Sequence, residues 1–511
     1  MAFQSILFEK VPTATVRETQ RMPDCFTDLN LDQVVAALTA GRQEYNLAPL
    51  FYTPLHDAET VKYRQAIAQD LEATDLTVGL NAFAQRMREM RRYLTFLENL
   101  SFKYHREGWF LEAVSVYCEA ATGLLQDLQA VAVTSRGFLA LRDFLVAYTT
   151  SEAFKQLLAE TTDLKSRLSS VHYSILIKGD CVRVRHYDAE CDYSQEVEHT
   201  FERFRRGAVK DYSARLSTGG GLNYVEAAIL EAVAKLNPEL FADLIAYCER
   251  HRDYLNAILQ SFDREIQFYL AYLDTIARLK QAGLPFCYPH VSPEVKEISV
   301  RDGFDLALAR KLVAQRETVV SNDILLQGEE RIIIITGPNQ GGKTTFARTF
   351  GQLLYLGSLG LPIPGRKARL FLPDHIFTHF EREENIQNLR GKLQDDLVRI
   401  RSILDRATGN TVIVMNEVFA STMLNDAVFL SKEIMERIIA LDLLCVFVTF
   451  IDELATLGPT TVSMVSTVAS DNPAVRTFKI VRKPADGLAY AMSIVRKHQL
   501  TYDCLKERLA A

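Results

Sequence analysis

The sequence lacks the features that mark several protein classes. Its eight cysteines include no Cys-x-x-Cys pair, which argues against both a disulfide framework and a zinc site. No apolar run approaches the ~20 residues that a membrane-spanning helix needs, and no secretory segment opens the chain. The net charge of −6 gives no general attraction to nucleic acid, so any DNA contact has to come from a local basic surface. We therefore expect a cytoplasmic protein with reduced thiols and no membrane partner.

The sequence changes character several times, which indicates more than one domain. A chain of 511 residues is long enough for two to four hydrophobic cores. Residues 29–169 are rich in helix formers, with apolar residues three and four positions apart. Two short runs, 173–177 and 181–187, flank a Lys-Gly-Asp turn and predict a β-hairpin. Helical periodicity returns at 224–282, and strand, loop and helix patterns alternate from residue 289 onward.

The final part of this pattern predicts an α/β fold. Its expected buried strands are residues 332–335, 412–415, 444–448, 462–468 and 478–481. We predict a mostly α-helical region with a small β-containing insertion, followed by an α/β domain. The expected boundaries are 1–170 for the first part of the helical region, 171–222 for the insertion, 223–288 for the second helical part and 289–511 for the α/β domain.

A glycine-rich motif lies between the predicted strand 332–335 and a helical stretch. It has the pattern G-x-x-x-x-G-K-[ST] and consists of Gly337, Pro338, Asn339, Gln340, Gly341, Gly342, Lys343 and Thr344. Glycines let consecutive backbone N–H groups approach phosphate oxygens, and the helix N-terminus adds a favourable dipole. The pattern predicts that Lys343 reaches the β- and γ-phosphates of ATP and that the Thr344 hydroxyl binds Mg²⁺. The alternative, a chance glycine-rich turn, is disfavoured by the flanking strand and helix.

A second polar element follows the predicted strand 412–415. A nucleotide-hydrolysing site of this kind needs an acidic group at the end of a neighbouring strand, and Asn416 and Glu417 occupy that position. Glu417 is the candidate that orients or deprotonates the attacking water. Asn416 keeps an acceptor oxygen near the Mg²⁺ shell but carries no charge. The alternative is a buried, hydrogen-bonded asparagine beside a surface glutamate.

The residues around the motif resemble those of one protein family. Residues 335–345 read ITGPNQGGKTT and look like the TGPNMGGKST of MutS-family mismatch-repair ATPases. Residues 320–323 and 357–364 resemble the segments on either side of that loop, and residues 57–70 are similar to the start of the family's lever domain. The resemblance implies an ABC/MutS-type P-loop ATPase domain behind a lever-like helical domain with a clamp-like insertion. It also adds Thr345 to the nucleotide-binding residues.

The family resemblance also implies cofactors and partners. In such proteins two ATPase domains pack head to tail, and a serine-containing loop of one subunit completes the site of the other. The lever and clamp close around DNA and respond to nucleotide. ATP and Mg²⁺ are therefore the implied cofactors, and DNA and a second copy of the chain are the implied partners. No Phe-x-Glu mismatch reader precedes the lever-like region, so we expect a short MutS-like protein without the N-terminal mismatch-recognition domain.

Three positions depart from the family pattern. Asn416 stands at the usual Walker B aspartate, Met423 at the usual serine of the signature loop, and Phe450 at the usual switch-loop histidine. The glycine-rich motif itself is intact. We therefore expect ATP binding, and we expect catalysis to depend on Lys343 and Glu417. The departures concern the steps that convert binding into hydrolysis.

Two hypotheses follow for the function. The first is a homodimeric, MutS-like ATPase whose nucleotide-driven closure acts on DNA in mismatch repair, other repair, recombination or defence. The second is a nucleotide-binding switch or scaffold with little turnover that acts through a protein partner. Asn416, Met423 and Phe450 favour the second hypothesis, whereas the complete glycine-rich motif is compatible with both. A nuclease is disfavoured because no carboxylate cluster with metal-ligand spacing lies outside the motif.

Three polar segments have open interpretations. The arginines between residues 84 and 106 either contact a DNA backbone or form a solvated helix face paired with nearby glutamates. The insertion 171–221 holds arginines balanced by acidic residues, and a DNA role there is as plausible as a structural one. Residues 379–393 either signal between the nucleotide and DNA sites, as the resemblance implies, or form a charged surface loop.

Overall fold

The computed structural model describes residues 3–9, 18–179, 181–188, 222–381, 391–419, 422–469, 475–485 and 506. The chain divides into two compact units. The first, which we call the helical unit, comprises Met1–Phe3, Ala73–Val133 and Phe138–Asp263. The second, the sheet unit, comprises Gln4–Glu72, Thr134–Gly137 and Arg264–Ala511. Residues 4–72 therefore belong to the sheet unit, whereas we expected residues 1–170 to form the first part of the helical region.

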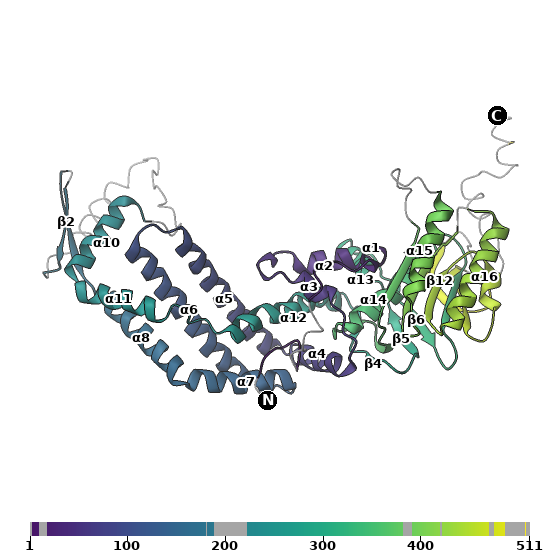
Figure 1. The fold of residues 1–511 in the computed structure, drawn as a ribbon, viewed down its shortest axis with the longest axis horizontal. Coiled ribbons are helices and arrows are strands. Elements are labelled where there is room, and N and C mark those ends of the chain that lie inside the picture. The colour runs from purple at the N-terminus through teal and green to yellow at the C-terminus, as the bar shows by residue number, and fades with distance from the viewer. Residues whose placement is uncertain are drawn as a thin grey trace. The chain divides into compact units, whose positions relative to one another are not determined.

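Long helices make up most of the helical unit. They are α5 (Thr74–Asn99), α6 (Lys103–Ala130), α7 (Arg136–Thr150), α8 (Glu152–Ser169), α10 (Tyr224–Leu236), α11 (Pro238–Arg250) and the start of α12 (Ala257–Gln281). Helices α5 and α6 lie side by side along their length (Figure 1). In α5 the buried Leu76, Leu80, Phe83 and Met87 recur at three- and four-residue steps, so one face of the helix supplies the core.

The hairpin expected in the insertion is present. Strands β1 (Tyr173–Lys178) and β2 (Cys181–His186) pair antiparallel, with Ile175 opposite Val184. Residues 189–221, which complete the insertion, lie outside the described part of the chain. Helix α10 then begins at a capping box, in which the side chains of Asn223 and Glu226 each accept a hydrogen bond from the other residue's backbone N–H.

The arginine-rich stretch 84–106 forms the end of α5 and the start of α6. Arg91 makes an ion pair with the buried Asp263, and the guanidinium of Arg92 lies 5.3 Å from the centre of the Phe96 ring. The hydroxyl of Tyr93 donates to Glu89 at 2.5 Å. These contacts within the helical unit favour the interpretation as a helix face that interacts with its own neighbours.

The sheet unit contains a six-stranded sheet in the order β10-β11-β12-β7-β13-β14. Its strands are β7 (Ile332–Thr336), β10 (Ile376–Phe380), β11 (Val412–Asn416), β12 (Leu444–Val448), β13 (Thr461–Val468) and β14 (Arg476–Arg482). All neighbouring pairs are parallel except β13 and β14. Each of the five strands expected from the sequence is present. The α/β character of the C-terminal region is thereby confirmed.

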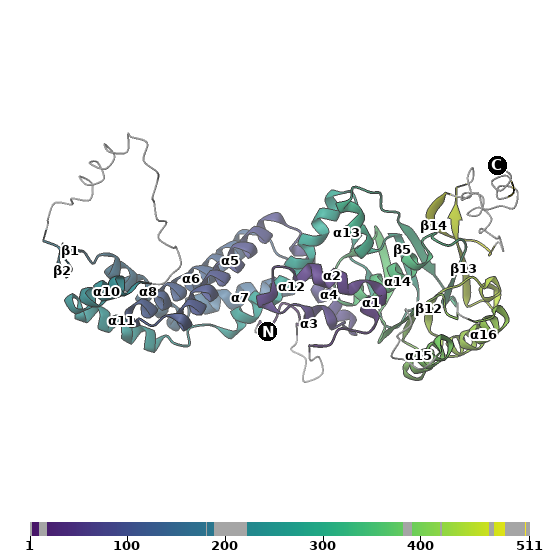
Figure 2. The same ribbon diagram turned by 90° about the horizontal axis from the view of Figure 1, so that it is seen from above.

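Helices cover both faces of this sheet. Helices α15 (Lys392–Arg406) and α16 (Leu424–Ala440) pack on one face, where Ile334, Met415 and Phe447 belong to the buried core cluster (Figure 2). Helix α14 (Lys343–Ser358) contacts β11 and β12. A sheet with both faces buried is the reason why β7, β11 and β12 read as uninterrupted apolar runs.

Smaller elements complete the sheet unit. A four-stranded sheet has the order β4-β9-β5-β6, and β3 pairs with β8. The remaining elements are α1 (Cys25–Leu29), α2 (Leu31–Thr39), η1 (Gln43–Tyr45), α3 (Ala48–Tyr52), α4 (Ala58–Asp70), β3 (Phe286–Cys287), β4 (His290–Ser292), β5 (Ile298–Gly303), α13 (Leu306–Ala314), β6 (Asn322–Leu326), β8 (Ile363–Pro364), β9 (Lys367–Phe371) and η2 (Asp452–Thr456).

The N-terminal helices are hydrogen-bonded to α14, which explains why residues 4–72 belong to the sheet unit. The side-chain amide of Gln352 donates to the Leu29 carbonyl at 2.8 Å, and the Tyr355 hydroxyl donates to the Phe51 carbonyl at 2.9 Å. The buried guanidinium of Arg64 donates to the carbonyl of Leu359, which caps α14, at 3.2 Å. These bonds satisfy buried polar groups in the second half of α14 and at its C-cap.

Candidate nucleotide-binding site

The glycine-rich loop, residues 337–342, joins the central strand β7 to helix α14. All five residues of β7 are buried, and the strand lies between β12 and β13. Gly342 is the N-cap of α14 and has a φ of 91°. Lys343, Thr344 and Thr345 form the first turn of that helix. The loop therefore lies at the carboxyl end of a parallel sheet, where α/β proteins bind their ligands.

Close packing against Ser466 of β13 explains two of the glycines. A Cβ atom on Gly337 would lie 2.9 Å from the Ser466 carbonyl oxygen and 3.0 Å from its nitrogen, and the φ of Gly337 is 110°. A Cβ atom on Gly341 would lie 2.1 Å from the Ser466 hydroxyl oxygen. That hydroxyl donates a hydrogen bond of 2.7 Å to the Gly341 carbonyl. Larger side chains at either glycine would displace the loop from β13.

The ammonium group of Lys343 is enclosed by the loop. It donates to the carbonyls of Gly337 at 2.9 Å and Pro338 at 3.2 Å, and to the side-chain oxygen of Asn339 at 3.1 Å. The residue is only 5% exposed. Burial lowers the pKa of Lys343, the negative charge of Glu417 opposes that effect, and Arg476 adds to it. The loop thus holds a cation among oxygen acceptors at the start of a helix.

Thr344 and Asn416 connect the loop to the neighbouring part of the sheet. The Thr344 hydroxyl donates to the side-chain oxygen of Asn416 at 2.9 Å. Asn416 is the last residue of β11 and is buried. The two oxygens suit a hard cation that keeps water and phosphate oxygens as its other ligands, as Mg²⁺ does. The donor chemistry of this pair therefore fits Mg²⁺.

Glu417 lies at the same edge of the sheet and has an unusual backbone conformation. Its φ is 52°, and its N–H donates to the Val448 carbonyl of β12 at 2.9 Å. Phe419, two residues later, has a φ of 61° and is fully buried in the core cluster. Left-handed backbone at residues other than glycine is costly and gathers at functional sites. The chain therefore turns sharply where it leaves β11.

The structure brings together the residues expected from the sequence. Those expected in the loop are Gly337, Pro338, Asn339, Gln340, Gly341 and Gly342, and those expected at the start of α14 are Lys343, Thr344 and Thr345. Asn416 contacts Thr344 directly, and the charge of Glu417 influences Lys343. Asn339 and Gln340 are exposed, whereas Pro338 and Gly341 are buried.

Two further residues, Ser466 and Arg476, contact the loop without a signal in the sequence. Ser466 holds Gly341 from β13, and the Arg476 side chain donates to the Asn339 carbonyl at 3.2 Å from β14. The side-chain amide of Asn322 in β6 donates to the Phe478 carbonyl at 3.2 Å, and its oxygen accepts from the Ile480 N–H at 2.8 Å. Ser466 and Arg476 lie far from the glycine-rich motif in sequence, and no local pattern marks them, whereas Asn322 lies in the segment 320–323 that resembles the family's approach to the loop.

Of the three residues that depart from the family pattern, two are exposed. Met423, the N-cap of α16, is 78% exposed, and Phe450, which follows β12, is 52% exposed. Residues 420–421, just before Met423, lie outside the described part of the chain, as do residues 382–390 of the segment 379–393, for which signalling and a charged surface loop were the two interpretations. In the described part of that segment, the buried His379 lies 3.2 Å from Asp396 of α15.

Two classes of feature are absent from the described part of the chain. Its His, Cys, Asp and Glu side chains form no group of three or more that could hold a metal ion. No helix there is both long and apolar enough to cross a lipid bilayer. At the candidate Mg²⁺ position the protein would therefore contribute Thr344 and Asn416, and the phosphate oxygens of a nucleotide would complete the site.

Comparisons with known proteins relate the sheet unit to one family. Residues 333–507 match the family model described as MutS domain V. A DNA mismatch repair protein MutS from Thermotoga maritima is 26% identical over 258 residues, which are 50% of this chain and 30% of that protein. Another, from Chlorobium phaeobacteroides, is 27% identical over 303 residues, which are 58% of this chain and 32% of that protein. The chain thus covers about a third of the length of these relatives.

Proposed function

Because the chain is a MutS-family protein with a MutS domain V, we propose that it binds ATP and Mg²⁺ at the glycine-rich loop and hydrolyses the nucleotide. We further propose that nucleotide-driven closure of a homodimer acts on DNA. The observation that carries the proposal is the grouping of Lys343, Thr344 and Asn416 at the end of β7 and β11. The family relationship supports a role related to DNA mismatch repair.

Phosphate binding rests on the loop and on Lys343. The first backbone N–H groups of α14, from Lys343 onward, have no acceptor within the helix, and the helix dipole there favours negative charge. The Lys343 ammonium is held at the loop by hydrogen bonds to three oxygens. The phosphates of ATP replace some of those oxygens as its partners, which relieves the cost of burying the charge. Arg476 adds a second positive charge near Asn339.

Mg²⁺ is held through the Thr344 hydroxyl, and Asn416 supports it. The ion neutralises charge on the phosphate oxygens when it is bound. Asn416 accepts the hydrogen bond that orients Thr344, so its own contribution is to position that hydroxyl and a water of the ion's shell. An amide does this without the negative charge that an aspartate supplies.

Hydrolysis rests on Glu417. Its carboxylate accepts a proton from the attacking water and orients that water toward the γ-phosphate. The left-handed backbone of Glu417 and its bond to Val448 fix the direction in which the side chain leaves β11. Lys343 contributes the positive charge that stabilises the developing charge on the phosphate oxygens.

ATP binding by purified protein tests this proposal. Filter binding with radiolabelled ATP and Mg²⁺ is expected to give saturable binding that Lys343→Ala weakens by at least about tenfold. Lys62→Ala is a matched control, because Lys62 is an exposed lysine of α4 that pairs with Glu59. Equal affinity in the wild type and in Lys343→Ala, or no affinity in either, contradicts the proposal.

A second function is favoured by the altered residues around the site. Asn416 lacks the charge of an aspartate, and the exposed Met423 and Phe450 present apolar surface. These residues suit a nucleotide-dependent switch or scaffold with little turnover, which acts through a protein partner. Tight ATP binding without hydrolysis on any DNA supports this alternative, and DNA-stimulated hydrolysis excludes it.

A further inference from the structure

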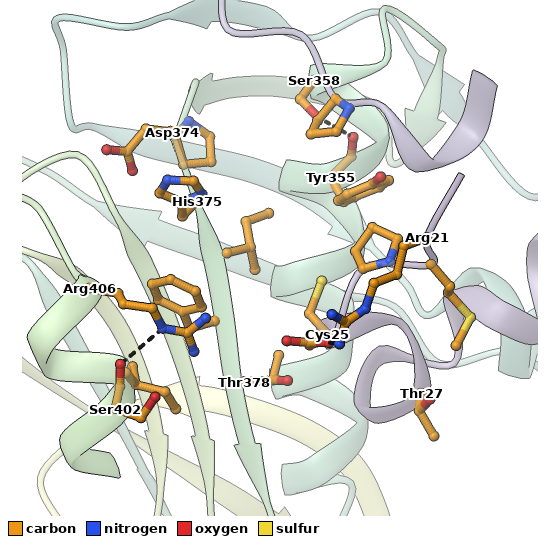
Figure 3. Close-up of a pocket in the computed structure, with 18 of the residues that line it drawn as sticks. Arg21, Cys25, Thr27, Tyr355, Ser358, Asp374, His375, Thr378, Ser402 and Arg406 are labelled. Atoms are coloured by element: carbon orange, nitrogen blue, oxygen red, sulfur yellow. Dashed lines mark hydrogen bonds and ion pairs between the residues drawn. The ribbon is translucent and has the colours of Figure 1, made fainter. Parts of the chain in front are cut away.

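The six-stranded sheet ends at β10, and the free edge of that strand borders a cavity. Among the described residues, β11 is the only strand that pairs with β10 in the sheet. The cavity has a volume of about 1010 Å³ and is also lined by residues 21–27, the last turn of α14 and the second half of α15 (Figure 3). All of these elements belong to the sheet unit. Unpaired strand edges are templates for pairing with another chain.

The direction of the backbone groups follows from one hydrogen bond. The N–H of Val412 in β11 donates to the His375 carbonyl at 2.9 Å, so the groups of His375 and Phe377 turn toward β11. Backbone groups alternate along a strand, and those of Ile376 and Thr378 therefore point away from the sheet. Within the described residues these outward groups have no hydrogen-bond partner. The Thr378 side chain bonds to Asp28 of α1, so α1 covers the later part of the edge.

The walls of this cavity are positively charged. Arg406 of α15 places its guanidinium 4.7 Å from the centre of the Phe377 ring and donates to the Ser402 carbonyl at 3.0 Å. No carboxylate in the described part of the chain forms an ion pair with Arg406. Arg21 enters from the opposite side of β10, as Figure 3 shows, and its pair with Asp24 is highly exposed on both partners. Exposed pairs of this kind contribute little and exchange readily.

The cavity is lined by three arginines (Arg21, Arg399 and Arg406) and two aspartates (Asp24 and Asp374), so arginine is in excess by one charge. Asp374 accepts hydrogen bonds from the hydroxyls of Thr408 and Thr411, the latter at 3.0 Å, and Asp24 pairs with Arg21. The chain as a whole carries a net charge of −6. Because the whole chain is negatively charged, the excess of arginine at this cavity is a local feature, and it favours negatively charged partners.

We propose that an extended, acidic segment of a partner protein binds in this cavity by adding a strand to the free edge of β10. The main-chain groups of Ile376 pair with the segment, as in other cases of strand addition. Acidic side chains of the segment contact Arg406 and Arg21, and its apolar side chains enter the space beside Tyr355. The guanidinium of Arg406 is oriented by Phe377 and Ser402 for contact with a carboxylate.

This binding site is separate from the nucleotide site. The strands β7 and β11 run parallel to β12, and β10 runs parallel to β11. The glycine-rich loop follows the carboxyl end of β7, whereas His375 and Ile376 lie at the amino end of β10. The inference therefore goes beyond ATP binding, and a failure of one does not entail a failure of the other.

Peptide binding to the full chain tests the inference. The probe is a fluorescein-labelled peptide of alternating glutamate and valine, about nine residues long, which matches a long strand. Two matched peptides isolate the contributions: one has lysine in place of glutamate, and the other has N-methyl groups on alternate amides and cannot pair along one edge. Fluorescence anisotropy is expected to show binding of the first peptide, with affinity at least about tenfold weaker for each of the other two.

Protein variants locate the binding site. Ile376→Pro removes the outward N–H and is tolerated on an edge strand, and Arg406→Glu reverses the charge. Each is expected to weaken binding of the glutamate–valine peptide at least about tenfold. Arg401→Glu is the control on the same helix, because Arg401 is exposed, pairs with Asp405 and does not line the cavity. Circular dichroism verifies that each variant is folded, and Arg406→Glu decides the outcome if Ile376→Pro is not.

Several results overturn the inference. No binding of the glutamate–valine peptide up to about 1 mM, the weakest range of specific association, is one. Equal affinity for the N-methylated peptide excludes strand addition, and equal affinity for the lysine peptide excludes the acidic partner. Self-association of the wild type that Ile376→Pro abolishes, measured by light scattering, assigns the edge to a second copy of the chain instead.

Discussion

The hydroxyl of Thr344 donates a 2.9 Å hydrogen bond to the side-chain oxygen of Asn416. This bond joins the first turn of α14 to the end of β11, so that the two residues nearest to the proposed Mg²⁺ position orient each other. In a family whose pattern has aspartate at this place, the amide preserves the hydrogen bond and lacks the charge. The geometry of the site can therefore be kept while its catalytic rate differs from that of a site with aspartate.

Restoring that charge is expected to increase turnover. Asn416→Asp keeps the acceptor for Thr344 and adds a negative charge near Mg²⁺, since ligand charge tunes the affinity for divalent cations. We expect half-maximal hydrolysis at an about tenfold lower Mg²⁺ concentration, and several-fold faster hydrolysis at saturating Mg²⁺. Phosphate release across a Mg²⁺ titration measures both. Asn410→Asp adds the same charge on the exposed turn before β11 and serves as the control. Slower hydrolysis in Asn416→Asp than in the wild type would show that the amide is the functional group.

Removing the hydroxyl of Ser466 is expected to loosen the glycine-rich loop. Ser466→Ala deletes the bond to the Gly341 carbonyl and should lower the free energy of unfolding by about 1 kcal/mol. It should also weaken ATP binding several-fold, because the loop is less well held. Ser463→Ala in the same strand removes a hydroxyl that is buried without a hydrogen-bond partner in the described structure.

Calorimetry and ATP titration of the two serine variants provide the comparison. The Ser463 change is expected to leave stability and affinity close to those of the wild type, since it removes an unsatisfied group. Equal losses in the two variants would argue that Ser466 has no particular connection with the loop.

Glu417→Gln is expected to trap the nucleotide-bound state. The amide cannot accept the proton of the attacking water, while the backbone bond to Val448 remains. Hydrolysis should fall at least about hundredfold, ATP affinity should stay within a few-fold, and the dimer should persist with ATP. Size-exclusion chromatography with light scattering measures the dimer. Unchanged turnover in this variant would remove Glu417 from the catalytic role.

Stability is expected to depend on pH through Glu265. Its carboxylate accepts hydrogen bonds of 2.9 Å from the Ser5 hydroxyl and the Ile6 N–H, and burial raises its pKa above 4.5. Above the ordinary pKa, the folded state therefore holds more protons at this group than the unfolded state does, and stability falls as pH rises through the raised pKa. Glu265→Gln removes the charge but keeps an acceptor oxygen.

Urea unfolding at several pH values measures this effect. Glu265→Gln is expected to be more stable than the wild type at pH 7, and the difference should shrink as the pH approaches the ordinary value of 4.5. The exposed Glu294 supplies a control, since Glu294→Gln should change stability little at either pH. An advantage of Glu265→Gln that grows on acidification would contradict this account.

The sequence predicted five of the six strands of the main sheet, most readily β7, β11 and β12, in which every residue is buried. Strand β10 was not predicted, and its first three residues are only partly buried. β7, β11 and β12 are short apolar runs, the composition expected of strands in a sheet that is covered on both faces. The motif 337–344 was also predictable, because its chemistry requires glycine, lysine and threonine at fixed spacing. Local composition and local spacing carry this information.

Contacts between distant segments left no comparable pattern. Ser466 lies in an apolar strand, and only the folded sheet places it against Gly341. The attachment of residues 4–72 to α14 depends on bonds such as those of Gln352 and Arg64, whose partners are backbone carbonyls of unremarkable residues. The cavity at β10 likewise arises from the strand order, which the sequence does not encode locally.

ATP hydrolysis on different DNA structures tests the central claim most directly. Phosphate release is measured with no DNA and with duplex, branched and single-stranded DNA, for the wild type and for Lys343→Ala. The account predicts turnover that at least one of these DNA structures stimulates several-fold and that Lys343→Ala abolishes. Tight ATP binding with no hydrolysis on any DNA, or equal turnover in Lys343→Ala, would contradict it.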